Sequence, residues 1–341
     1  VLRHVGWTME DLDGVVAGNR FHFLPRLFPN ASPIEGEHDL FGGTHKSWLT
    51  LQALFAREGL LAKGTEQFNR WALKRRFGRV VDLVDHHTAH AWSAYLTSDF
   101  PEALAVSVDN VGDGFSARVF GCSQGRLEPL WESGAVESAG QFYGEISQYL
   151  GFHVLMAGKV TGLAARGNPA LAYPVMEKLF SLTPDKRAFR LAPLWSKRRN
   201  HGLFESLKGM SREDISAAAQ KRLEDVLVEY VAHALEATGH SNVVLAGGVF
   251  ANVLVNHRLW QLPQVKGLFV HPAMSDQGIA VGAALGSNAT QSPTLPTPIP
   301  DVYLGPSYDE ESIGLALEES GLRYQRRGDR IFEDVSRLLA E

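Results

Sequence analysis

The stretch ALAVSVDNVGDGFSARVFGCSQGRLEPLWES, residues 103–133, decides the fold class. It contains three strand-like runs, at 103–110, 115–123 and 126–133. Two short glycine-containing turns, Gly112–Gly114 and Gln124–Gly125, separate the runs, and such turns join neighbouring strands that run in opposite directions. The stretch therefore predicts a meander of three antiparallel strands.

Helical and strand-like patterns alternate on both sides of this meander. RVVDLVD at 79–85 alternates like a strand, and residues 88–98 have helical apolar spacing. Residues 211–239 form one long amphipathic pattern, with Ser211 suited to cap its start and Gly239 to end it. Its apolar stripe is Ile215, Ala219, Leu223, Val226, Leu227, Tyr230, Val231 and Leu235. The pattern of a mixed α/β layer fold is completed by five further segments. Three are strand-like, at 13–19, 242–248 and 267–273, and two are helical, at 141–152 and 276–286.

The two ends of the chain are less clearly patterned. Residues 23–43 are rich in Pro, Gly and Asn, and residues 45–76 have helical apolar spacing. Residues 290–300 contain four prolines and predict an extended connector, followed by surface helices. Because the chain begins at Val1, we expect either that its start was removed or that it is a piece of a longer protein.

Composition narrows the class of protein. The 341 residues suggest about two domains, and the net charge of −5 argues weakly against a dedicated nucleic-acid binder. The basic clusters at 74–76 and 197–199 are typical of a solvated face. A single cysteine, Cys122, rules out an internal disulfide and a cysteine-ligated zinc site, and suits a reducing, cytoplasmic compartment. No apolar run approaches the roughly 20 residues that span a bilayer, so no membrane contact is expected.

Three histidines in DHHTAHAWSAYL, residues 85–96, are the first candidates for chemistry. His86 and His90 are four apart, so on a helix both project from one face, as in metal-binding helices. A solvated helix face explains the same spacing equally well. Asp109 at a strand end and Asp276 at a strand-to-helix junction could complete a metal site, although each alone reads as a turn or N-cap residue.

Four glycine-rich turns, at 109–114, 158–167, 246–252 and 275–284, suggest an anion site. The last two follow apolar strands and open helices, a geometry that presents backbone N–H groups to a phosphate. Gly247 and Gly248 would let the backbone approach closely, and Lys159 could supply a positive charge. None of the turns matches the Walker or dinucleotide fingerprint, which indicates a different nucleotide-binding fold.

Five motifs in a fixed order carry a family resemblance. They are HHTAHA (86–91), VDNVGDG (108–114), GKVTGLAARG (158–167), LAGGVFANVLVN (245–256) and HPAMSDQGIAVGAALG (271–286), and YLGPSYDEESI (303–313) follows them. From about residue 79 onward the chain thus resembles the carbamoyltransferase family. That family includes nodulation-factor carbamoyltransferases and O-carbamoyltransferases of antibiotic biosynthesis.

The resemblance implies a fold and a metal site. The fold is the actin–hexokinase-like ATPase fold, similar to that of the tRNA threonylcarbamoyl-transfer protein. One metal ion, iron by preference over zinc or manganese, would be bound by His86, His90, Asp109 and Asp276. His87, which lies beside these ligands, is the candidate general base.

The resemblance also implies a nucleotide and a reaction. ATP or carbamoyl adenylate, with Mg²⁺ accompanying ATP, would lie near Lys159, Gly162, Gly247, Gly248 and Asn252, and near Asp113 and Gly114. Carbamoyl phosphate and ATP would give carbamoyl adenylate, with release of phosphate and pyrophosphate. The carbamoyl group would then pass to a hydroxyl of a small natural product or sugar. Metal and N–H groups would stabilise the leaving AMP.

The chain departs from the family pattern at both ends. We expect an N-terminal subdomain at 1–135 that lacks its first strand and a His–Asp stretch, and a C-terminal subdomain at 136–290. Residues 291–341 would form a connector to an absent YrdC-like domain that makes carbamoyl adenylate from carbamoyl phosphate. Thr161 and Asn110 stand where relatives usually carry Met and Gly. A homodimer is compatible with this arrangement.

Three other interpretations stay open at this point. A tRNA threonylcarbamoyl transferase would share the metal and nucleotide sites, although the acidic balance counts against it. A sugar kinase or ATPase of the same superfold would need a carboxylate Mg²⁺ site in place of a histidine pair. A non-catalytic scaffold would bind neither metal nor nucleotide.

Overall fold

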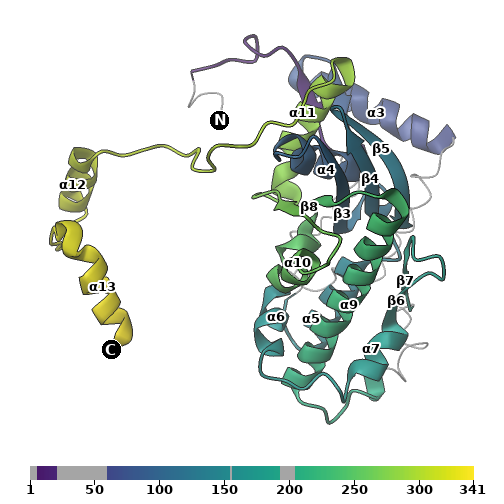
Figure 1. Cartoon of the computed structure of the whole chain (residues 1–341). Helices are drawn as coiled ribbons and strands as arrows, with labels where there is room; N and C mark the ends of the chain where they lie inside the picture. The colour runs from purple at the N-terminus through teal and green to yellow at the C-terminus, as the bar shows by residue number, and fades with distance from the viewer. Residues whose placement is uncertain (1–5, 21–59, 154–155, 193–203) are drawn as a thin grey trace. The chain divides into compact units, whose positions relative to one another are not determined.

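The computed structural model describes residues 6–20, 60–153, 156–192 and 204–341 (Figure 1). Two compact units are present, Val1–Ile299 and Pro300–Glu341. The helical pattern expected at 45–76 is described only in its last part, as α3 (Leu60–Phe77). The loop at 23–43 and the basic cluster at 197–199 lie outside the described residues.

A five-stranded sheet forms the centre of the first unit. Its order is β5-β4-β3-β8-β9, with β3 (Glu102–Gly112), β4 (Phe115–Ser123), β5 (Arg126–Gly134), β8 (Asn242–Ala246) and β9 (Gly267–Val270). The pairs β3–β4 and β4–β5 are antiparallel, whereas β3–β8 and β8–β9 are parallel. The expected meander and the mixed α/β class are therefore confirmed. A meander followed by two parallel strands is also the strand order of the actin–hexokinase-like ATPase fold.

The turns of the meander need left-handed backbone. Asp113 and Gly114 have φ of 48° and 91° between β3 and β4, and Gln124 and Gly125 have φ of 49° and 70° between β4 and β5. Two consecutive positive φ angles are typical of the tight turn that matches the twist of paired strands. The sequence places a glycine second in each turn, where it adopts this conformation without strain.

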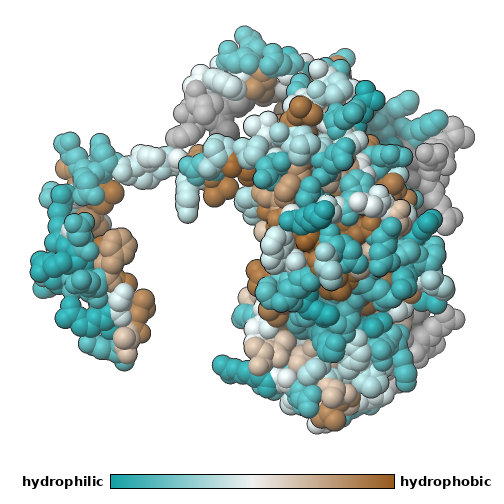
Figure 2. All heavy atoms as spheres, viewed as in Figure 1, coloured by the Kyte–Doolittle hydropathy of each residue, from teal (hydrophilic) through white to brown (hydrophobic). Residues whose placement is uncertain are grey.

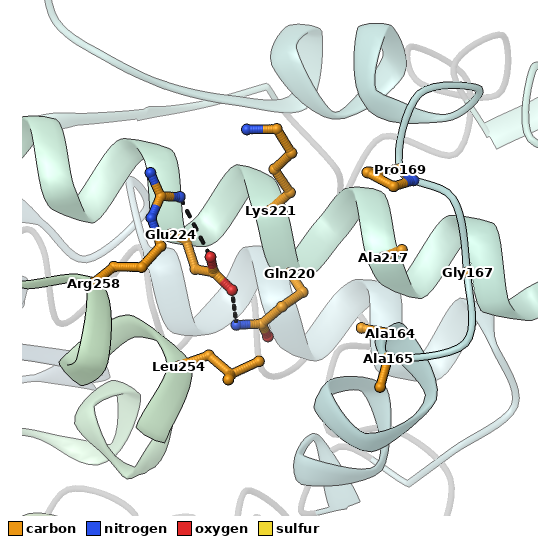
Figure 3. A pocket seen from close by; sticks show the side chains of 10 residues that line it. All are labelled: Ala164, Ala165, Gly167, Pro169, Ala217, Gln220, Lys221, Glu224, Leu254 and Arg258. Atoms are coloured by element: carbon orange, nitrogen blue, oxygen red, sulfur yellow. Dashed lines mark hydrogen bonds and ion pairs between the residues drawn. The ribbon is translucent and has the colours of Figure 1, made fainter.

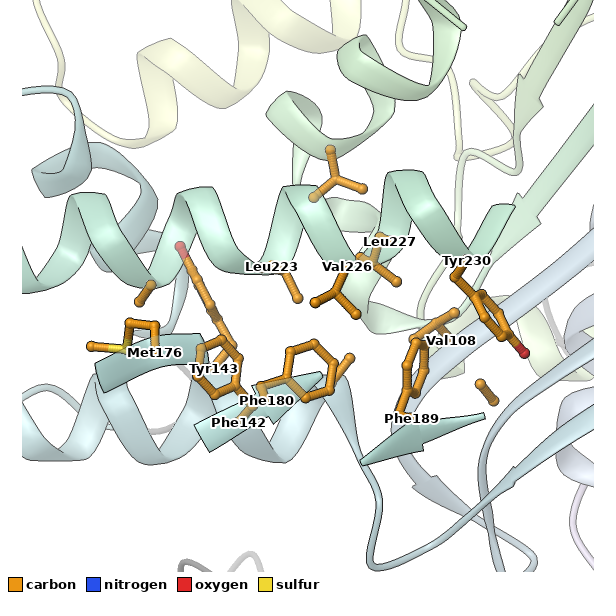
Figure 4. Close-up of a cluster of buried hydrophobic side chains, with 14 of the residues drawn as sticks. Val108, Phe142, Tyr143, Met176, Phe180, Phe189, Leu223, Val226, Leu227 and Tyr230 are labelled. Carbon is orange, nitrogen blue, oxygen red and sulfur yellow. The ribbon is translucent and has the colours of Figure 1, made fainter. Parts of the chain in front are cut away.

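Helices cover both faces of the sheet, so its central strand is buried on both sides (Figure 1). Leu104, Val106 and Val108 of β3 pack in a core with α5 (Ala139–Tyr149) and α9 (Arg212–Thr238). Aromatic rings from α5, β6 (Phe180–Leu182) and β7 (Phe189–Leu191) pack against one another in this core, the first two stacked and the last tilted (Figure 4). Ala103 and Ala105 face the opposite side, toward α4 (His86–Leu96). A strand that is buried on both faces has a nearly continuous apolar sequence.

The long helix α9 begins and ends as its sequence predicts. The Ser211 side chain accepts a hydrogen bond from the Asp214 N–H, and Gly239 ends the helix at φ 76°. All eight residues of the expected apolar stripe are buried. The stripe therefore fixes which face of α9 meets the sheet.

The remaining elements are short. Strand β1 (Val15–Ala17) pairs in parallel with β2 (Val81–Leu83). The other elements of the first unit are α6 (Gly158–Ala164), α7 (Tyr173–Leu179), the 3₁₀ helices η3 (Gly248–Ala251) and η4 (Asp276–Gly278), α10 (Val253–Trp260) and α11 (Ile279–Gln291). The proline-rich connector is extended, and its Thr297 N–H donates to the Leu96 carbonyl. None of the described helices combines the length and apolar content needed to cross a bilayer.

The second unit contains α12 (Glu310–Glu319), η5 (Gly328–Arg330) and α13 (Ile331–Ala340). Apolar residues, drawn in brown, gather along one side of this unit (Figure 2). Phe332, Leu338 and Leu339 of α13 are exposed. The expected surface helices are thus present.

Helices α4 and α11 pack at unusually close range. A Cβ atom at Gly282 would lie 1.8 Å from the Ala89 carbonyl oxygen, and one at Gly286 would lie 2.2 Å from the Trp92 ring. The α4 backbone cannot move aside for an added methyl group as the end of a flexible side chain could. Glycine is therefore required in α11 where this helix crosses α4.

We predict that Gly282→Ala lowers the free energy of unfolding by about 1–3 kcal/mol or more, because the added methyl overpacks the α4 backbone. Gly64→Ala in α3 is the matched control, since its Cβ would meet open space. The control should stabilise the chain by about 0.5–1 kcal/mol through the better helix propensity of alanine. Denaturant unfolding measures both changes, and equal effects of the two substitutions would contradict the packing.

Candidate metal centre

Helix α4 starts at the histidine cluster and is held there by a cap. The Oδ1 atom of Asp85 accepts a hydrogen bond of 2.9 Å from the Thr88 N–H. Every residue of α4 except Thr88 is buried. His86 and His90 lie on one face with ring centroids 4.8 Å apart and are 2% and 0% exposed. The interpretation of this pair as a solvated helix face is therefore wrong.

Two carboxylates from other segments meet these imidazoles. Asp109 lies toward the carboxyl end of β3, and Asp276 opens η4 after β9. From His90 Nε2, the distance is 3.2 Å to Asp109 Oδ2 and 3.6 Å to Asp276 Oδ1. Both corresponding distances from His86 Nε2 are 3.7 Å. One ligand atom from each of the four residues lies within 4.8 Å of all the others.

The donor set fits a metal ion. Both nitrogens of His86 and the Nδ1 atom of His90 are buried without a hydrogen-bond partner. Buried polar atoms normally have partners, so this cluster has binding capacity that the protein itself leaves unused. Two imidazoles and two carboxylates suit iron, zinc or manganese.

The carboxylates favour positive charge at the centre. Burial alone would lower the pKa of His90, but hydrogen bonds to Asp109 and Asp276 outweigh it and raise that pKa to about 9. Burial alone would likewise raise the pKa of Asp109, but the two imidazoles hold it well below its usual range. A metal ion would occupy the same field and compete with the proton.

His87 is held by two hydrogen bonds that leave it no free lone pair. Its Nε2 atom lies 3.0 Å from the Phe115 carbonyl, which only accepts, so Nε2 carries the proton. Its Nδ1 atom then accepts from the Ser107 hydroxyl at 2.8 Å. Burial and the neighbouring His86 lower the pKa of His87 to about 3. The expected role of His87 as general base does not fit this geometry, in which it ties α4 to β3 and β4.

Asp113 and Gly114 also have structural positions. The carboxylate of Asp113 accepts from the His86 N–H at 2.9 Å and from the Arg20 N–H at 2.8 Å and 3.0 Å. Burial and the nearby Asp85 raise the pKa of Asp113 to about 6. Asp113 thus anchors the start of α4, and Gly114 forms the β3–β4 turn. This geometry disfavours the predicted nucleotide contact of Asp113.

The glycine pair of the fourth motif lies directly beside the metal centre. Gly247 has φ of 102°, and a Cβ there would lie 2.1 Å from the Val108 carbonyl oxygen. A Cβ at Gly248 would lie 3.1 Å from Asp109 Oδ1. Only glycine therefore allows η3 to start against the end of β3. The four residues of η3 then lead to Asn252, the N-cap of α10.

Asn252 connects this segment to a surface pocket. It exchanges two hydrogen bonds with Gln220 of α9, of 2.9 Å and 3.0 Å. Gln220 in turn lines a pocket of about 370 Å³ (Figure 3). The other lining residues are Ala164, Ala165, Gly167, Pro169, Ala217, Lys221, Glu224, Leu254 and Arg258. The pocket has apolar walls and a charged end, where Arg258 Nη1 lies 3.3 Å from Glu224 Oε2.

Lys159 and Gly162 are exposed on α6, which leads into one wall of this pocket. The Lys159 Nζ lies 5.9 Å from the centre of the Phe152 ring. Sequence reasoning missed Gln220, Glu224 and Arg258. Gln220 and Glu224 are spaced at i and i+4 beside the apolar stripe of α9, a spacing shared by ordinary solvated helix faces, so the sequence gives no specific signal for them.

His271, at the start of the fifth motif, is a further residue that sequence reasoning missed. It is buried, and its Nδ1 atom accepts from the Ala273 N–H at 3.0 Å. Burial and the nearby charge of His90 lower its pKa. A histidine at the end of an apolar strand gives no sequence signal that separates it from an ordinary core residue.

Known proteins resemble this chain along most of its length. Nodulation protein NolNO of Sinorhizobium fredii is 31% identical over 319 residues, which are 89% of this chain and 43% of that protein. Nodulation protein NolO of Bradyrhizobium diazoefficiens is 32% identical, over 75% of this chain and 48% of its own length. A tRNA N6-adenosine threonylcarbamoyltransferase of Desulforapulum autotrophicum is 30% identical over 52% of each chain.

The chain spans about half the length of the curated relatives it matches. Among solved structures, HypF of T. kodakarensis is a distant likeness, with a TM-score of 0.46, 14% identity and coverage of 67% of this chain and 39% of that one. The sequence model of the carbamoyltransferase N-terminus matches residues 41–285, a range that contains all four candidate ligands and the whole pocket. This chain therefore belongs to the carbamoyltransferase family.

Proposed function

We propose that this chain is a carbamoyl-transfer domain that moves a carbamoyl group from carbamoyl adenylate to a hydroxyl of a small molecule. One observation carries the proposal. A four-ligand cluster lies beside a glycine pair, and the segment after that pair leads to a pocket with apolar walls and a charged end. A metal centre and a nucleotide site side by side are what such a transfer requires.

The dimensions suit a nucleotide. Asn252 lies four residues beyond Gly248, and a 3₁₀ helix rises about 2 Å per residue, so about 8 Å of backbone separates them. A nucleoside would occupy the pocket, with the base against Leu254 and Ala164 and the ribose hydroxyls toward Glu224. The phosphate end would extend along η3 to the four-ligand cluster.

The residues of this chain would bind and orient the reacting groups. A bound metal, with iron proposed and zinc or manganese as alternatives, would supply charge neutralisation for the phosphate and the carbamoyl oxygen. Gly247 and Gly248 would let backbone approach the phosphate without a side chain between them. His86, His90, Asp109 and Asp276 would hold the cation at the point where negative charge develops on the leaving AMP.

A histidine pair argues against the sugar-kinase alternative, because Mg²⁺ prefers an all-oxygen environment. The threonylcarbamoyl alternative would use the same metal and nucleotide sites. The longer match to the nodulation proteins favours a small-molecule acceptor over tRNA. Direct binding to tRNA and to amino sugars separates these two acceptors.

We predict that His90→Ala and Asp109→Asn each reduce bound metal at least about tenfold, by analogy with the 10–100-fold losses that follow even outer-shell changes. His257→Ala, an exposed histidine of α10, is the control and should keep full stoichiometry. Metal analysis of the purified variants gives the result. If His90→Ala keeps its full metal content, the proposed metal centre is wrong.

We predict that ATP at about 100 times its dissociation constant stabilises the chain by about 2.7 kcal/mol, a rise in melting temperature of about 3–5 °C. Leu254→Trp should abolish the rise because the indole fills the pocket. Arg187→Ala, which lies away from this pocket, should leave it unchanged. An undiminished rise in Leu254→Trp would place the nucleotide elsewhere.

We predict metal-dependent transfer when carbamoyl adenylate and a hydroxyl acceptor are supplied directly. The measurement is carbamate-ester formation and AMP release, compared between the unmodified chain and His90→Ala. If AMP release is no faster with the chain than without it, the transfer proposal fails.

A further inference from the structure

Arg118 lies outside the metal centre but contacts the residue that starts its helix. Arg118 is on β4, and its Nη1 atom lies 3.1 Å from Oδ1 of Asp85. That same oxygen accepts from the N–H and the hydroxyl of Thr88, both at 2.9 Å. The Arg118 and Asp85 side chains are 19% and 12% exposed. The helix cap and the ion pair therefore share a single, largely buried oxygen atom.

The Arg118 guanidinium is itself restricted, mainly by two aromatic rings. It lies over the rings of Phe115 and Phe120, 4.9 Å and 5.5 Å from their centres. Its Nη2 atom lies 3.3 Å from Glu132 Oε2 on β5. Glu132 is 53% exposed, so its ion pair contributes little, and the two ring contacts are what restrict the guanidinium. Arg118 therefore offers Asp85 a partner of restricted position whether or not Glu132 is charged.

This contact ties the histidine helix to β4, the strand that pairs with the ligand-bearing strand β3. Arg118 pairs in register with Ser107 of β3, two residues before Asp109. His86 directly follows Asp85 and is the first residue of α4. The first turn of a helix lacks intrahelical partners for its N–H groups and depends on its cap. Because ligand distances must hold to about 0.2 Å, a shift of this cap would misplace His86 relative to Asp109.

We propose that Arg118 is a positioning residue for the metal centre, acting through its contact with Asp85. The guanidinium fixes where α4 begins relative to β3 and so sets the distances from His86 and His90 to Asp109. This inference rests on the metal site of the proposed function.

Two neighbours of Arg118 provide matched controls. Arg118, Glu132 and Arg187 line one pocket of about 500 Å³, together with Trp131. The Arg187 guanidinium lies over the Trp131 ring at 5.4 Å. Glu132 binds the far side of the Arg118 guanidinium and is 53% exposed. Substitutions at Arg187 and Glu132 change the same pocket while the contact between Arg118 and Asp85 is kept.

The experiment measures Co²⁺ and Zn²⁺ affinity of the full chain by competition with a chromophoric chelator. Arg118→Gln should bind 10–100-fold more weakly, the range found for residues that orient metal ligands. Its Co²⁺ absorption bands should shift, since they report ligand geometry. Arg118→Lys should restore part of the affinity. Arg187→Gln and Glu132→Gln should match the unmodified chain in both measurements.

A double-substitution cycle tests the route through Asp85. Asp85→Asn keeps an oxygen that can cap the helix but removes the charge that Arg118 contacts. If Arg118 acts through Asp85, the pair Arg118→Gln and Asp85→Asn together should weaken binding no more than the larger single effect.

Three outcomes would overturn the inference. The first is unmodified affinity and an unmodified Co²⁺ spectrum in Arg118→Gln, whatever its melting temperature. The second is an equal loss in Arg118→Gln and Glu132→Gln. The third is absence of metal uptake by the unmodified chain, which overturns the proposed function as well, whereas the first two leave that function standing.

Discussion

The structure depends on burial of the first turn of α4 against the end of β3. Two imidazoles in that turn are almost fully removed from water. Buried groups that can carry charge are tolerated only with partners of opposite charge, and Asp109 supplies the closest one. Burying this turn requires α11 and η3 to approach α4 and β3 closely. Glycine is required in α11 where it crosses α4, and at the start of η3 where it meets β3.

Local sequence patterns predicted the layers of the fold and offered the four clustered residues as candidates, whereas their convergence was predicted only through the family resemblance. The meander and the apolar stripe of α9 are local signals, and local signals predict elements well. Asp109 and Asp276 meet because β3, β8 and β9 are neighbours in the sheet, and no short-range pattern specifies that order. Only the fixed order of five motifs, through the family resemblance, placed the two aspartates beside the histidines.

The roles of His87, Asp113 and Glu224 were beyond sequence reasoning for a different reason. The residue type shows which hydrogen bonds a side chain can make, but not which of them the fold already uses. Both ring nitrogens of His87 are hydrogen-bonded, to Ser107 and Phe115, and the carboxylate of Asp113 accepts hydrogen bonds from two backbone N–H groups. Glu224 looks like any polar residue of a surface helix until α6 and α10 are placed around it (Figure 3).

The raised pKa of His90 links the fold to the chemistry of the centre. The raised pKa favours the protonated imidazole in the metal-free chain, within 3.2 Å of Asp109 and 3.6 Å of Asp276. A metal ion bound here would compete with this proton and would meet carboxylates and imidazoles that are already close together. The helix cap, the glycine contacts and the bonds of His87 all hold that arrangement without the metal. The protein itself therefore brings the four side chains together, and a metal ion bound there would find its ligands already placed by the packing of α4 against the sheet.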